Sequence, residues 1–320
     1  MNHMNHMNHM NHMNHMNHMT PKTPRTTIRF LLPLVVVVGA SVAGGQDQSP
    51  PSPIAMEGKR QTEDAGTPVW KPIFNGRDLD GWVYKETGSE LGVDPSSTVK
   101  VEDGVIRMDY GKWDSFKGRF GHLFHKVPHD RYRVRVVYRF TGDQVKGGPG
   151  WAFRNSGIML HCQDPKSMRT DQDFPVSVEV QLLGGAGAGS RSTGNLCTPG
   201  TNVEMKKDVV TRHCTNSKSE TFHGDQWVTA EGEVLGNDSI THYINGVEVM
   251  KYQRPQLDPR DPDAQSLMQQ RNGEVMLDRG WISLQGESHP VEFKSVELMV
   301  LPEAEPAGTS TPGPTSKPQK

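Results

Sequence analysis

Two polar side chains that share one face of a predicted strand are the first candidates for chemistry. In the run from 176 to 183, valine and leucine alternate with residues that include Glu179 and Gln181. A carboxyl group and an amide two residues apart on a rigid strand can hold a ligand across a sheet, and we expect both to face a groove open to solvent. An ordinary half-buried strand with its polar face in water gives the same pattern, so the strand alone leaves both interpretations open.

A second polar run precedes this strand and supplies further candidates. Asn155-Ser-Gly-Ile-Met-Leu-His161 begins with an amide and ends with an imidazole, and we expect it to form the neighbouring strand. Earlier in the chain, His122 and His125 lie three residues apart, which places them on opposite faces of a regular strand. We therefore expect only His122 to face the same cleft. For each histidine, a structural role with satisfied hydrogen bonds is the alternative.

The elements that must position these residues are strands almost throughout. Only 261–271 is typical of a helix, with Asp261 as its cap. Asn245-Gly246 is a strong signal for a hairpin turn. Many strands and one short helix indicate an all-β antiparallel sandwich or barrel. Apolar or alternating runs predict strands at 69–74, 81–84, 99–101, 105–108, 131–140, 227–235, 239–245, 247–252, 280–284 and 291–301.

We expect the predicted strands to form one folded part at 69–301. Both ends of the chain differ from it in composition. Residues 1–19 repeat Met-Asn-His and form a low-complexity leader, for which histidine-rich metal binding is the alternative. Residues 20–43 resemble a signal peptide, with basic residues, a short apolar core and small residues after it. An uncleaved anchor is the alternative, although the apolar run is too short to span a bilayer. Residues 44–68 and 302–320 are expected as a disordered linker and tail.

The predicted signal peptide implies export to the periplasm or the extracellular space, with no stable membrane span in the mature protein. In such a compartment one pair of the three cysteines can be oxidised, and we favour Cys197–Cys214 over pairs that include Cys162. The spacing of the three matches no zinc site. Nothing in the sequence predicts the oligomeric state.

Charge argues against nucleic acid as a partner. The formal net charge is −2 and no cluster of lysine and arginine dominates. The run 131–140 places arginines on one strand face, which is typical of a solvated sheet face, an acidic ligand being the alternative. The glycine-rich segment 184–189 follows a strand but opens no helix, so we expect a loop beside Glu179 and no phosphate-binding site.

A series of short motifs spans the folded part in a fixed order. They are Ile73-Phe-Asn-Gly-Arg-Asp-Leu-Asp-Gly-Trp82, Asn155-Ser-Gly-Ile158 with Glu179-Val-Gln181, Asp225-Gln-Trp227, His242-Tyr-Ile-Asn-Gly246, Gly280-Trp-Ile-Ser-Leu-Gln-Gly286 and Pro290-Val-Glu-Phe293. In this order the chain resembles the 3-keto-disaccharide hydrolase domain family. The resemblance implies a concanavalin-like jelly-roll sandwich of two antiparallel sheets, of which the concave one carries sugar in related folds.

The chain also departs from the family pattern around the expected cleft. His161 stands where many members have arginine, and Leu183-Gly184 stands where they have Leu-Asp. The segment between Cys197 and Cys214 is longer than in the simplest members. These differences prevent the identity of the substrate from being transferred.

The substrate class that the resemblance implies has its own chemistry. A ketone at C3 of a sugar acidifies the proton on C2, so a base can remove that proton and the C1 oxygen can leave by β-elimination. Water can then add back, which gives net hydrolysis. This route needs a base, a group that stabilises the enolate oxygen and a proton donor. It does not need the flanking carboxyl pair of an ordinary glycosidase.

Glu179 is the first candidate for the base, or for a metal ligand, because burial would raise its pKa toward a useful range. His161 is the second. Together they supply two ligands for a divalent ion in a catalytic site, and a structural calcium is a further alternative. No cofactor is certain.

The remaining candidates would bind the sugar. Gln181 can bind hydroxyl groups, and Arg154 and Asn155 can hold the ketone oxygen or a hydroxyl. Trp151 follows a glycine-rich turn and can stack on a sugar ring, whereas Trp227 starts an alternating strand and is expected in the core. His122 is expected in the same cleft.

Three functions therefore remain open. The first is an exported enzyme that hydrolyses, or eliminates across, glycosidic bonds of 3-keto sugars, with carbohydrate as its partner. The second is a non-catalytic carbohydrate-binding or adhesion module of the same fold. The third is a structural envelope protein whose polar groups in the cleft satisfy one another.

Overall fold

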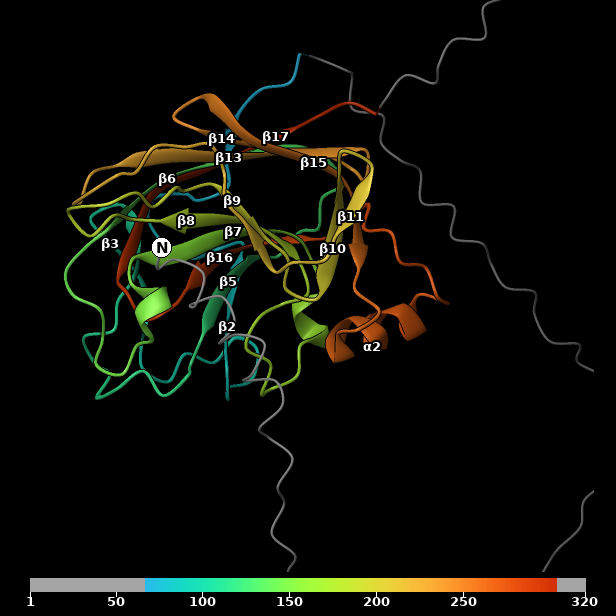
Figure 1. The fold of residues 1–320 in the computed structure, drawn as a ribbon. Coiled ribbons are helices and arrows are strands. Elements are labelled where there is room, and N and C mark those ends of the chain that lie inside the picture. The colour runs from blue at the N-terminus through green and yellow to red at the C-terminus, as the bar shows by residue number, and fades with distance from the viewer. Residues whose placement is uncertain (1–66, 304–320) are drawn as a thin grey trace, which may run out of the picture. The chain divides into compact units, whose positions relative to one another are not determined.

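The computed structural model describes residues 67–303, which fold into two antiparallel sheets packed as layers (Figure 1). The larger sheet has ten strands in the order β11, β10, β15, β14, β13, β6, β17, β4 and β3, with β1 paired to β17. Its strands are β1 (Lys71–Pro72), β3 (Val99–Glu102), β4 (Val105–Met108), β6 (Arg131–Phe140), β10 (Thr201–Met205), β11 (Asp208–Val210), β13 (Val228–Leu235), β14 (Ser239–Ile244), β15 (Val247–Leu257) and β17 (Val291–Val300).

The smaller sheet has seven strands in the order β12, β9, β8, β7, β16, β5 and β2. The helix α2 (Pro262–Gln270) and the short 3-10 turns η1 (Gly150–Ala152) and η2 (Pro165–Ser167) lie outside the sheets. The predicted all-β sandwich with one short helix is confirmed. The strands are β2 (Trp82–Glu86), β5 (Gly121–His125), β7 (Asn155–Cys162), β8 (Val178–Leu183), β9 (Asn195–Cys197), β12 (Cys214–Thr215) and β16 (Trp281–Gly286).

The core lies between the sheets because strands on both sides alternate apolar and polar residues. Along β6, every second residue from Tyr132 to Phe140 is buried in the main cluster. The smaller sheet contributes Val178, Val180 and Leu182 from β8 to the same cluster. Each such side chain stabilises the fold by about 1.5–3 kcal/mol. Since side chains alternate between the two faces of a strand, the same pattern turns Glu179 and Gln181 away from this core.

Local signals explain several of the boundaries. Asn245 and Gly246 both have positive φ, 48° and 80°, as a tight hairpin turn between β14 and β15 requires. Asp261 caps α2 by accepting a hydrogen bond from the Ala264 amide at 2.9 Å. The predicted strand at 69–74 is wrong in extent, because only Lys71–Pro72 pair with β17.

The arginine row of β6 forms a paired outer face of the larger sheet. Trp227, which we expected in the core, lies on this face, with the Arg139 guanidinium 4.4 Å from its ring centre. The arginines leave no site for an acidic ligand, because carboxylates on β13 and β17 neutralise them. The pairs are Arg133–Glu231 at 2.7 Å, Arg135–Glu297 at 2.9 Å and Arg139–Glu292 at 2.7 Å.

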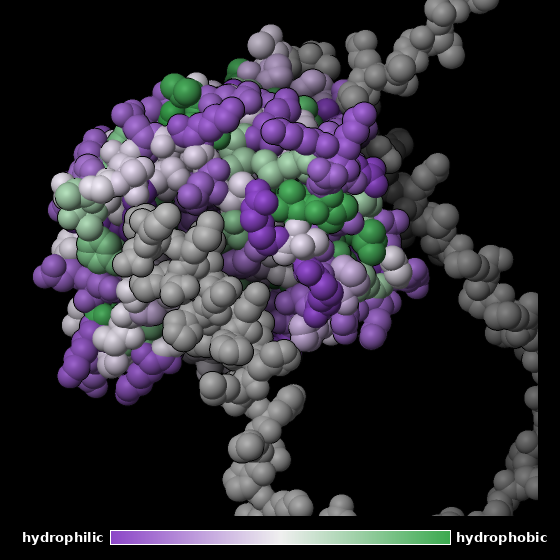
Figure 2. Space-filling model, in the orientation of Figure 1, coloured by the Kyte–Doolittle hydropathy of each residue, from purple (hydrophilic) through white to green (hydrophobic). Residues whose placement is uncertain are grey.

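The visible surface gives no sign of a large apolar docking face. Figure 2 shows mostly hydrophilic residues on the side drawn, with hydrophobic residues in small separate groups. Within residues 67–303, no helix is both long and apolar enough to cross a membrane. The predicted leader and signal peptide, and nearly all of the predicted linker and tail, lie outside the described residues.

Candidate active site

A row of polar residues crosses the face of the smaller sheet that points away from the core. Strand pairing places Lys85 of β2 opposite His122 of β5, and His122 opposite Gln285 of β16. On the other side, Gly157 of β7 is paired with Gln181 of β8. The β7–β16 register, with Leu284 opposite Ile158, carries Gln285 next to Gly157. The row therefore brings together Gln181 and His122, which the sequence placed in one cleft.

The backbone of Glu179 lies beside this row, and its side chain extends into the row. On β8 it is opposite Met159 and Cys197. A Cβ atom on Gly157 would lie 2.9 Å from Glu179 Cδ, so the carboxyl group extends over that glycine. Only glycine leaves enough space here for the carboxyl group. This explains why the Asn-Ser-Gly motif ends in glycine.

The prediction that Glu179 stands in a groove open to solvent is wrong. Its side chain faces away from the core, but the residue is only 5% exposed. It lies between β7 and β9 with its carboxyl group folded over Gly157, and this packing removes it from solvent. Gln181 is partly exposed, as expected for a ligand-binding amide.

A second carboxyl group, that of Glu287, interacts with the first. Glu287 follows β16, where Ser283, Gln285 and Glu287 alternate with the core residues Ile282 and Leu284. Burial raises the pKa of Glu179 well above its usual value, and the charge of Glu287 raises it further. Burial also raises the pKa of Glu287, to about 8. At neutral pH the two carboxyl groups therefore hold at least one proton between them.

Arg191 supplies a positive charge that acts on Glu287. Its guanidinium donates hydrogen bonds to the backbone carbonyl oxygens of Gly184 at 2.8 Å and Trp151 at 3.1 Å, and also to that of Phe153. These bonds fix the glycine-rich loop against the segment before β7. The Arg191 charge opposes the rise in the pKa of Glu287, whereas burial lowers the pKa of Arg191 itself.

Four buried polar atoms on this face have no hydrogen-bond partner among the described residues. They are His122 Nε2, Asn155 Oδ1, Gln285 Oε1 and Glu287 Oε2. Buried polar groups in folded proteins are nearly always paired, so these four atoms, on or directly after the neighbouring strands β5, β16 and β7, leave hydrogen-bonding capacity for a polar ligand. The asparagine and the histidine were both predicted here. A ligand rich in hydroxyl groups can donate to all four atoms.

Gln181 is held in one orientation. Its Oε1 accepts a hydrogen bond from Asn195 Nδ2 at 3.0 Å. Asn195 is itself fixed by Ser192 and by the Ser217 amide. The Gln181 amide nitrogen is thereby kept as a donor for a ligand.

Aromatic rings border the polar row on the side of His122. Trp151 stacks on Phe120, with 5.8 Å between ring centres and 14° between planes. Phe174 contacts Phe120 at 4.6 Å and His122 at 6.0 Å. Trp151 is partly exposed. Its stacking on a sugar ring stays a prediction.

His161 does not join Glu179. It has a φ of 50°, and the register of β7 with β16 shifts between Met159 and Cys162, so the strand bulges there. The bulge turns the ring toward the larger sheet, where His161 Nε2 lies 2.9 Å from the carbonyl oxygen of Gly236. Burial lowers the pKa of His161, which favours the neutral form.

The proposed metal pair of Glu179 and His161 is therefore wrong as a ligand set. Within residues 67–303, no group of three or more His, Cys, Asp or Glu side chains is arranged to hold a metal ion.

Arg154 makes contacts that the sequence did not predict. Its guanidinium pairs with Asp225 at 3.1 Å and donates to the carbonyl oxygen of Gly224. These contacts fasten the loop before β13. Arg154 Nε is buried and has no hydrogen-bond partner among the described residues, so a role for Arg154 in holding the ketone oxygen stays a prediction.

A disulfide closes the edge of the same sheet. Cys197 and Cys214 are bonded, with 4.2 Å between their α-carbons, and they pair β9 with the edge strand β12. Cys197 is directly opposite Glu179. Cys162 is free and buried.

Sequence reasoning missed four residues of this site, one of which is Lys85 at the β2 end of the row. Gln285 and Glu287 carry the same period-two signal that identified Glu179 and Gln181, and a search of the 281–287 run for that alternation finds them. Arg191 lies in an irregular loop, where no periodicity marks it.

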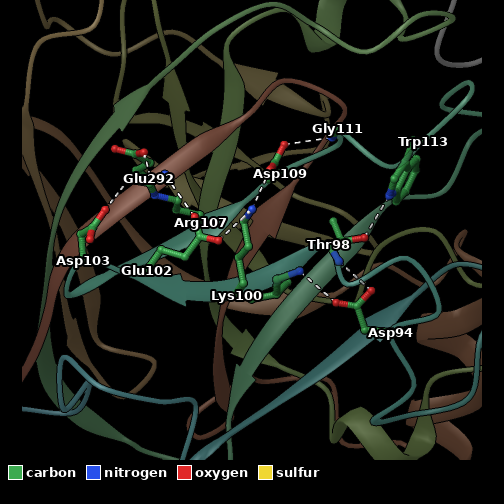
Figure 3. A network of polar contacts seen from close by, with 11 residues as sticks. Asp94, Thr98, Lys100, Glu102, Asp103, Arg107, Asp109, Gly111, Trp113 and Glu292 are labelled. Atoms are coloured by element: carbon green, nitrogen blue, oxygen red, sulfur yellow. Dashed lines mark hydrogen bonds and ion pairs between the residues drawn. The ribbon is translucent and has the colours of Figure 1, made fainter.

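A second charged cluster lies on the larger sheet and has a different character (Figure 3). Arg107 pairs with Glu102, Asp103 and Glu292, and Lys100 pairs with Asp109 at 2.9 Å. A groove of about 380 Å³ runs beside it, lined in part by Arg107, Asp109 and Glu292. The Lys100 ammonium lowers the pKa of the Asp109 carboxyl, so its charge is fixed at neutral pH. Because these charges pair with one another, we place the candidate active site at Glu179 and Glu287.

Comparison with known proteins identifies the folded part. A family model for the 3-keto-alpha-glucoside-1,2-lyase-like domain matches residues 69–299. No curated protein matches the chain.

Among solved structures, the chain is similar to a candidate glycosyl hydrolase from Parabacteroides distasonis ATCC 8503, with 16% identity, 73% of this chain and 94% of that chain covered and a TM-score of 0.43. It is also similar to the carbohydrate-binding module CBM66 from Bacillus subtilis, with 8% identity, coverage of 58% and 89% and a TM-score of 0.33. The exoplasmic/lumenal domain of VIP36 gives 8% identity, coverage of 74% and 90% and a TM-score of 0.42. At these identities the likeness concerns the fold alone.

Proposed function

The chain belongs to the family of 3-keto-alpha-glucoside-1,2-lyase-like domains, and from this premise we propose that it cleaves glycosidic bonds of 3-keto sugars. The observation that carries the proposal is the buried pair of carboxyl groups on Glu179 and Glu287, beside polar atoms that have no partner among the described residues. A pair of acidic groups with displaced pKa values in one site is typical of acid–base catalysis.

The reaction can be written so that atoms and electrons balance. A base removes the C2 proton, and the C–H electron pair forms a double bond between C1 and C2. The bond from C1 to the glycosidic oxygen breaks, its electron pair leaves with the oxygen, and that oxygen takes a proton from an acid. Water then adds across the double bond, which restores the keto sugar and gives net hydrolysis.

Residues of the row suit the other requirements of this reaction. The Gln181 amide can donate a hydrogen bond to the enolate oxygen or to a hydroxyl group. Asn155 Oδ1 and Gln285 Oε1 can accept hydrogen bonds from sugar hydroxyls. Trp151 can stack on the C–H face of a sugar ring at the border of the site.

A non-catalytic carbohydrate-binding module is the second candidate. The stacked pair of Trp151 and Phe120 favours it, because an aromatic platform binds sugar without any need for acid–base groups. The third possibility, a vestigial cleft whose polar groups satisfy one another, is disfavoured by the four unpartnered atoms.

Export to the periplasm or the extracellular space is part of the proposal. The disulfide between Cys197 and Cys214 supports it, because such bonds persist in oxidising compartments. Cell fractionation with an antibody against the folded part would test it, and a cytosolic location would contradict it.

The central experiment compares purified wild-type protein with Glu179→Gln on a 3-keto-α-glucoside disaccharide. We expect wild type to release free sugar from the oxidised disaccharide but not from the unoxidised one, and Glu179→Gln to be at least 100-fold slower. Glu233→Gln, on the outer face of the larger sheet, is the matched control and should keep full activity. Assays with added divalent ions and with a chelator test the metal alternative.

Two outcomes would reject the enzyme. If wild type releases no sugar at any pH or with any added ion, the catalytic proposal fails. If the protein then binds glycans with an affinity that survives Glu179→Gln and is lost in Trp151→Ala, the binding module is the correct function.

A further inference from the structure

Resting on the proposed function, we propose that the Gln181 amide binds the oxygen on C3 of the sugar and that Asn195 makes the site select a ketone there. Gln181 is the residue that touches the substrate, and Asn195 acts through it as a positioning residue. The direction of the hydrogen bonds between β8 and β9 determines whether the ligand meets a donor or an acceptor.

Every hydrogen-bonding position of the Asn195 amide is occupied. Asn195 is opposite Gln181 in the pairing of β8 with β9 and is only 2% exposed. Its Oδ1 accepts hydrogen bonds from Ser192 Oγ at 2.8 Å and from the Ser217 backbone amide at 2.9 Å. Its Nδ2 donates to the Ser192 carbonyl oxygen and to Gln181 Oε1, each at 3.0 Å. These four bonds use the two donor hydrogens and the two lone pairs of the amide.

The Ser217 backbone amide makes this orientation of Asn195 unambiguous. A backbone N–H can only donate, so the Asn195 atom that faces it must be the oxygen. The nitrogen then faces Gln181, and the Gln181 atom that meets it must be an acceptor, Oε1. Ser217 is itself held in place, because its hydroxyl donates to the Thr193 carbonyl oxygen at 2.6 Å. The polarity of Gln181 is therefore set before any ligand binds.

The outward end of Gln181 is consequently a donor. Its Nε2 has no hydrogen-bond partner among the described residues, and the side chain is partly exposed. A ketone or enolate oxygen can only accept, whereas a hydroxyl can donate or accept. Asn155 presents the opposite polarity, since its Nδ2 donates to the Trp151 carbonyl oxygen at 3.5 Å and its Oδ1 has no partner. The two amides together suit a sugar with one ketone among its hydroxyl groups.

The position of Gln181 in the sheet agrees with a contact to C3. Gln181 is paired with Gly157, and the Glu179 carboxyl group extends over that glycine. In the proposed reaction the C2 proton is removed beside the carboxyl groups, and C3 is bonded directly to C2. The amide can therefore hold the C3 oxygen while the acid–base groups reach C2 and C1. That oxygen gains negative charge during elimination, so the donor stabilises the transition state more than the substrate.

The other donors on this face are less able to select a ketone. Arg154 Nε is the rival, because it is buried without a partner, but the other guanidinium nitrogens bind Asp225 and the Gly224 carbonyl oxygen. Lys85 donates to two carbonyl oxygens at the far end of the row, on β2. Gln285 has no side-chain hydrogen bond to a described residue, so it can turn either end of its amide to a ligand.

Replacing Asn195 with aspartate should reverse the polarity of Gln181 at nearly constant shape. A carboxylate still accepts from Ser217 and Ser192, but it cannot donate to Gln181 Oε1, so Gln181 must turn its Oε1 to the ligand. For Asn195→Asp we expect kcat/KM on a 3-keto disaccharide to fall at least 100-fold, mostly through kcat. The Ki of the unoxidised disaccharide as a competitive inhibitor should stay within about 3-fold, because its C3 hydroxyl can donate to Oε1.

Further variants separate this effect from added charge and from damage to the fold. Asn195→Ala frees Gln181 without adding a charge and should reduce kcat by about 10-fold. Gln181→Met removes the donor, and adding Asn195→Asp to it should cause no further loss if Asn195 acts only through Gln181. Asn272→Asp makes the same exchange at an exposed position after α2 and should keep full activity.

The orientation of Gln181 can be measured without any substrate. In the full chain labelled with ¹⁵N, the Gln181 side-chain amide is identified by its loss in Gln181→Met. In Asn195→Asp its hydrogens bond to a carboxylate, so they should exchange with water at least 10-fold more slowly than in wild type. Equal exchange rates in the two proteins would overturn the role of Asn195, whether or not the protein is an enzyme.

The remaining outcomes distinguish the selection of a ketone from the proposed function. If Asn195→Asp and Gln181→Met keep wild-type turnover while Arg154→Gln loses it, the ketone lies at Arg154 and the assignment to Gln181 is wrong, although the enzyme stands. If wild type cleaves nothing, the proposed function fails, and calorimetry then compares binding of the 3-keto and the unoxidised disaccharide. A preference for the 3-keto form that Asn195→Asp abolishes would still support the selection, and a wild type without that preference would reject it.

Discussion

The carboxyl group of Glu179 lies over Gly157 on the neighbouring strand, so that a Cβ atom there would come within 2.9 Å of Glu179 Cδ. This relationship links two motifs that are more than twenty positions apart in the chain. The glycine leaves space for the carboxyl group, and the carboxyl group occupies the space beside the second acid, Glu287. The absence of a side chain at Gly157 therefore determines where the Glu179 carboxyl group can lie.

Replacing Gly157 with alanine should reduce turnover more than it reduces the stability of the fold. In Gly157→Ala the Glu179 side chain must rotate away, and because its end is flexible we expect a stability cost of about 1–3 kcal/mol. The carboxyl group is displaced from the row, so turnover of a 3-keto disaccharide should fall by at least 10-fold. Gly150→Ala is the matched control, because a Cβ there meets no atom within 4 Å. Unchanged turnover in Gly157→Ala would show that the position of Glu179 over Gly157 is not needed.

Two partly exposed tryptophans, Trp151 and Trp227, should differ in their effect on substrate binding. Trp151 stacks on Phe120 at the border of the polar row, whereas Trp227 packs against Arg139 on the outer face of the larger sheet. We expect Trp151→Ala to raise KM for the disaccharide by about 10-fold or more, equivalent to roughly 1.4 kcal/mol, and Trp227→Ala to leave KM unchanged. Steady-state kinetics measures both, and equal effects of the two variants would remove Trp151 from the site.

The disulfide should contribute both stability and local order. It closes a loop with a sequence separation of 17 and joins the edge strand β12 to β9. Removing it in Cys197→Ser with Cys214→Ser should lower the free energy of unfolding by about 3 kcal/mol. Denaturant unfolding of oxidised and reduced protein measures the difference, and Cys162→Ala, at the free buried cysteine, controls for thiol effects. Identical curves with and without reductant would contradict this.

Period-two alternation accounts for most of what the sequence could predict. It turned Glu179 and Gln181 to one face and the valines of β8 to the other, and it applies equally to Gln285 and Glu287. The burial of Glu179 was not visible in this pattern. It depends on the neighbouring strands and on the glycine beneath the carboxyl group, which are distant in sequence.

The sequence predicted positions less well for residues that lie outside the regular period-two alternation. His161 lies near the end of β7, but a positive φ and a bulge turn it toward Gly236, in the turn between β13 and β14. Arg154 and Arg191 both lie outside the strands. The position of Arg154 depends on its contact with Asp225, and that of Arg191 depends on hydrogen bonds to four backbone carbonyl oxygens. Propensity and spacing contain no information on those contacts.

The buried carboxyl pair should make stability fall as pH rises above neutral. For Glu287, the folded state holds its proton up to about pH 8, whereas the unfolded chain releases it near its usual value of 4.5. Between these values the folded state binds more protons than the unfolded state, so the free energy of unfolding decreases with pH. The raised pKa of Glu179 acts in the same direction.

Buried histidines make the free energy of unfolding rise with pH in a lower pH range. The effect of the carboxyl groups can therefore be measured separately only above that range. Burial lowers the pKa of His242 and His289 from 6.5 to about 4, so between those values the unfolded state binds more protons and stability rises with pH. Above pH 6.5 this contribution is complete. Between about pH 6.5 and 8, Glu287 alone should lower the free energy of unfolding by about 2 kcal/mol, and Glu179 should add to this decrease.

Urea unfolding of wild type and of the double variant Glu179→Gln with Glu287→Gln at about pH 6.5, 7.2 and 8 tests this directly. We expect wild type to lose stability across the series and the double variant to remain constant, because it has no carboxyl proton to release. Glu233→Gln, which leaves the pair intact, should follow wild type. A double variant with the same slope as wild type would mean that other groups cause the dependence and that the two carboxyl groups ionise normally.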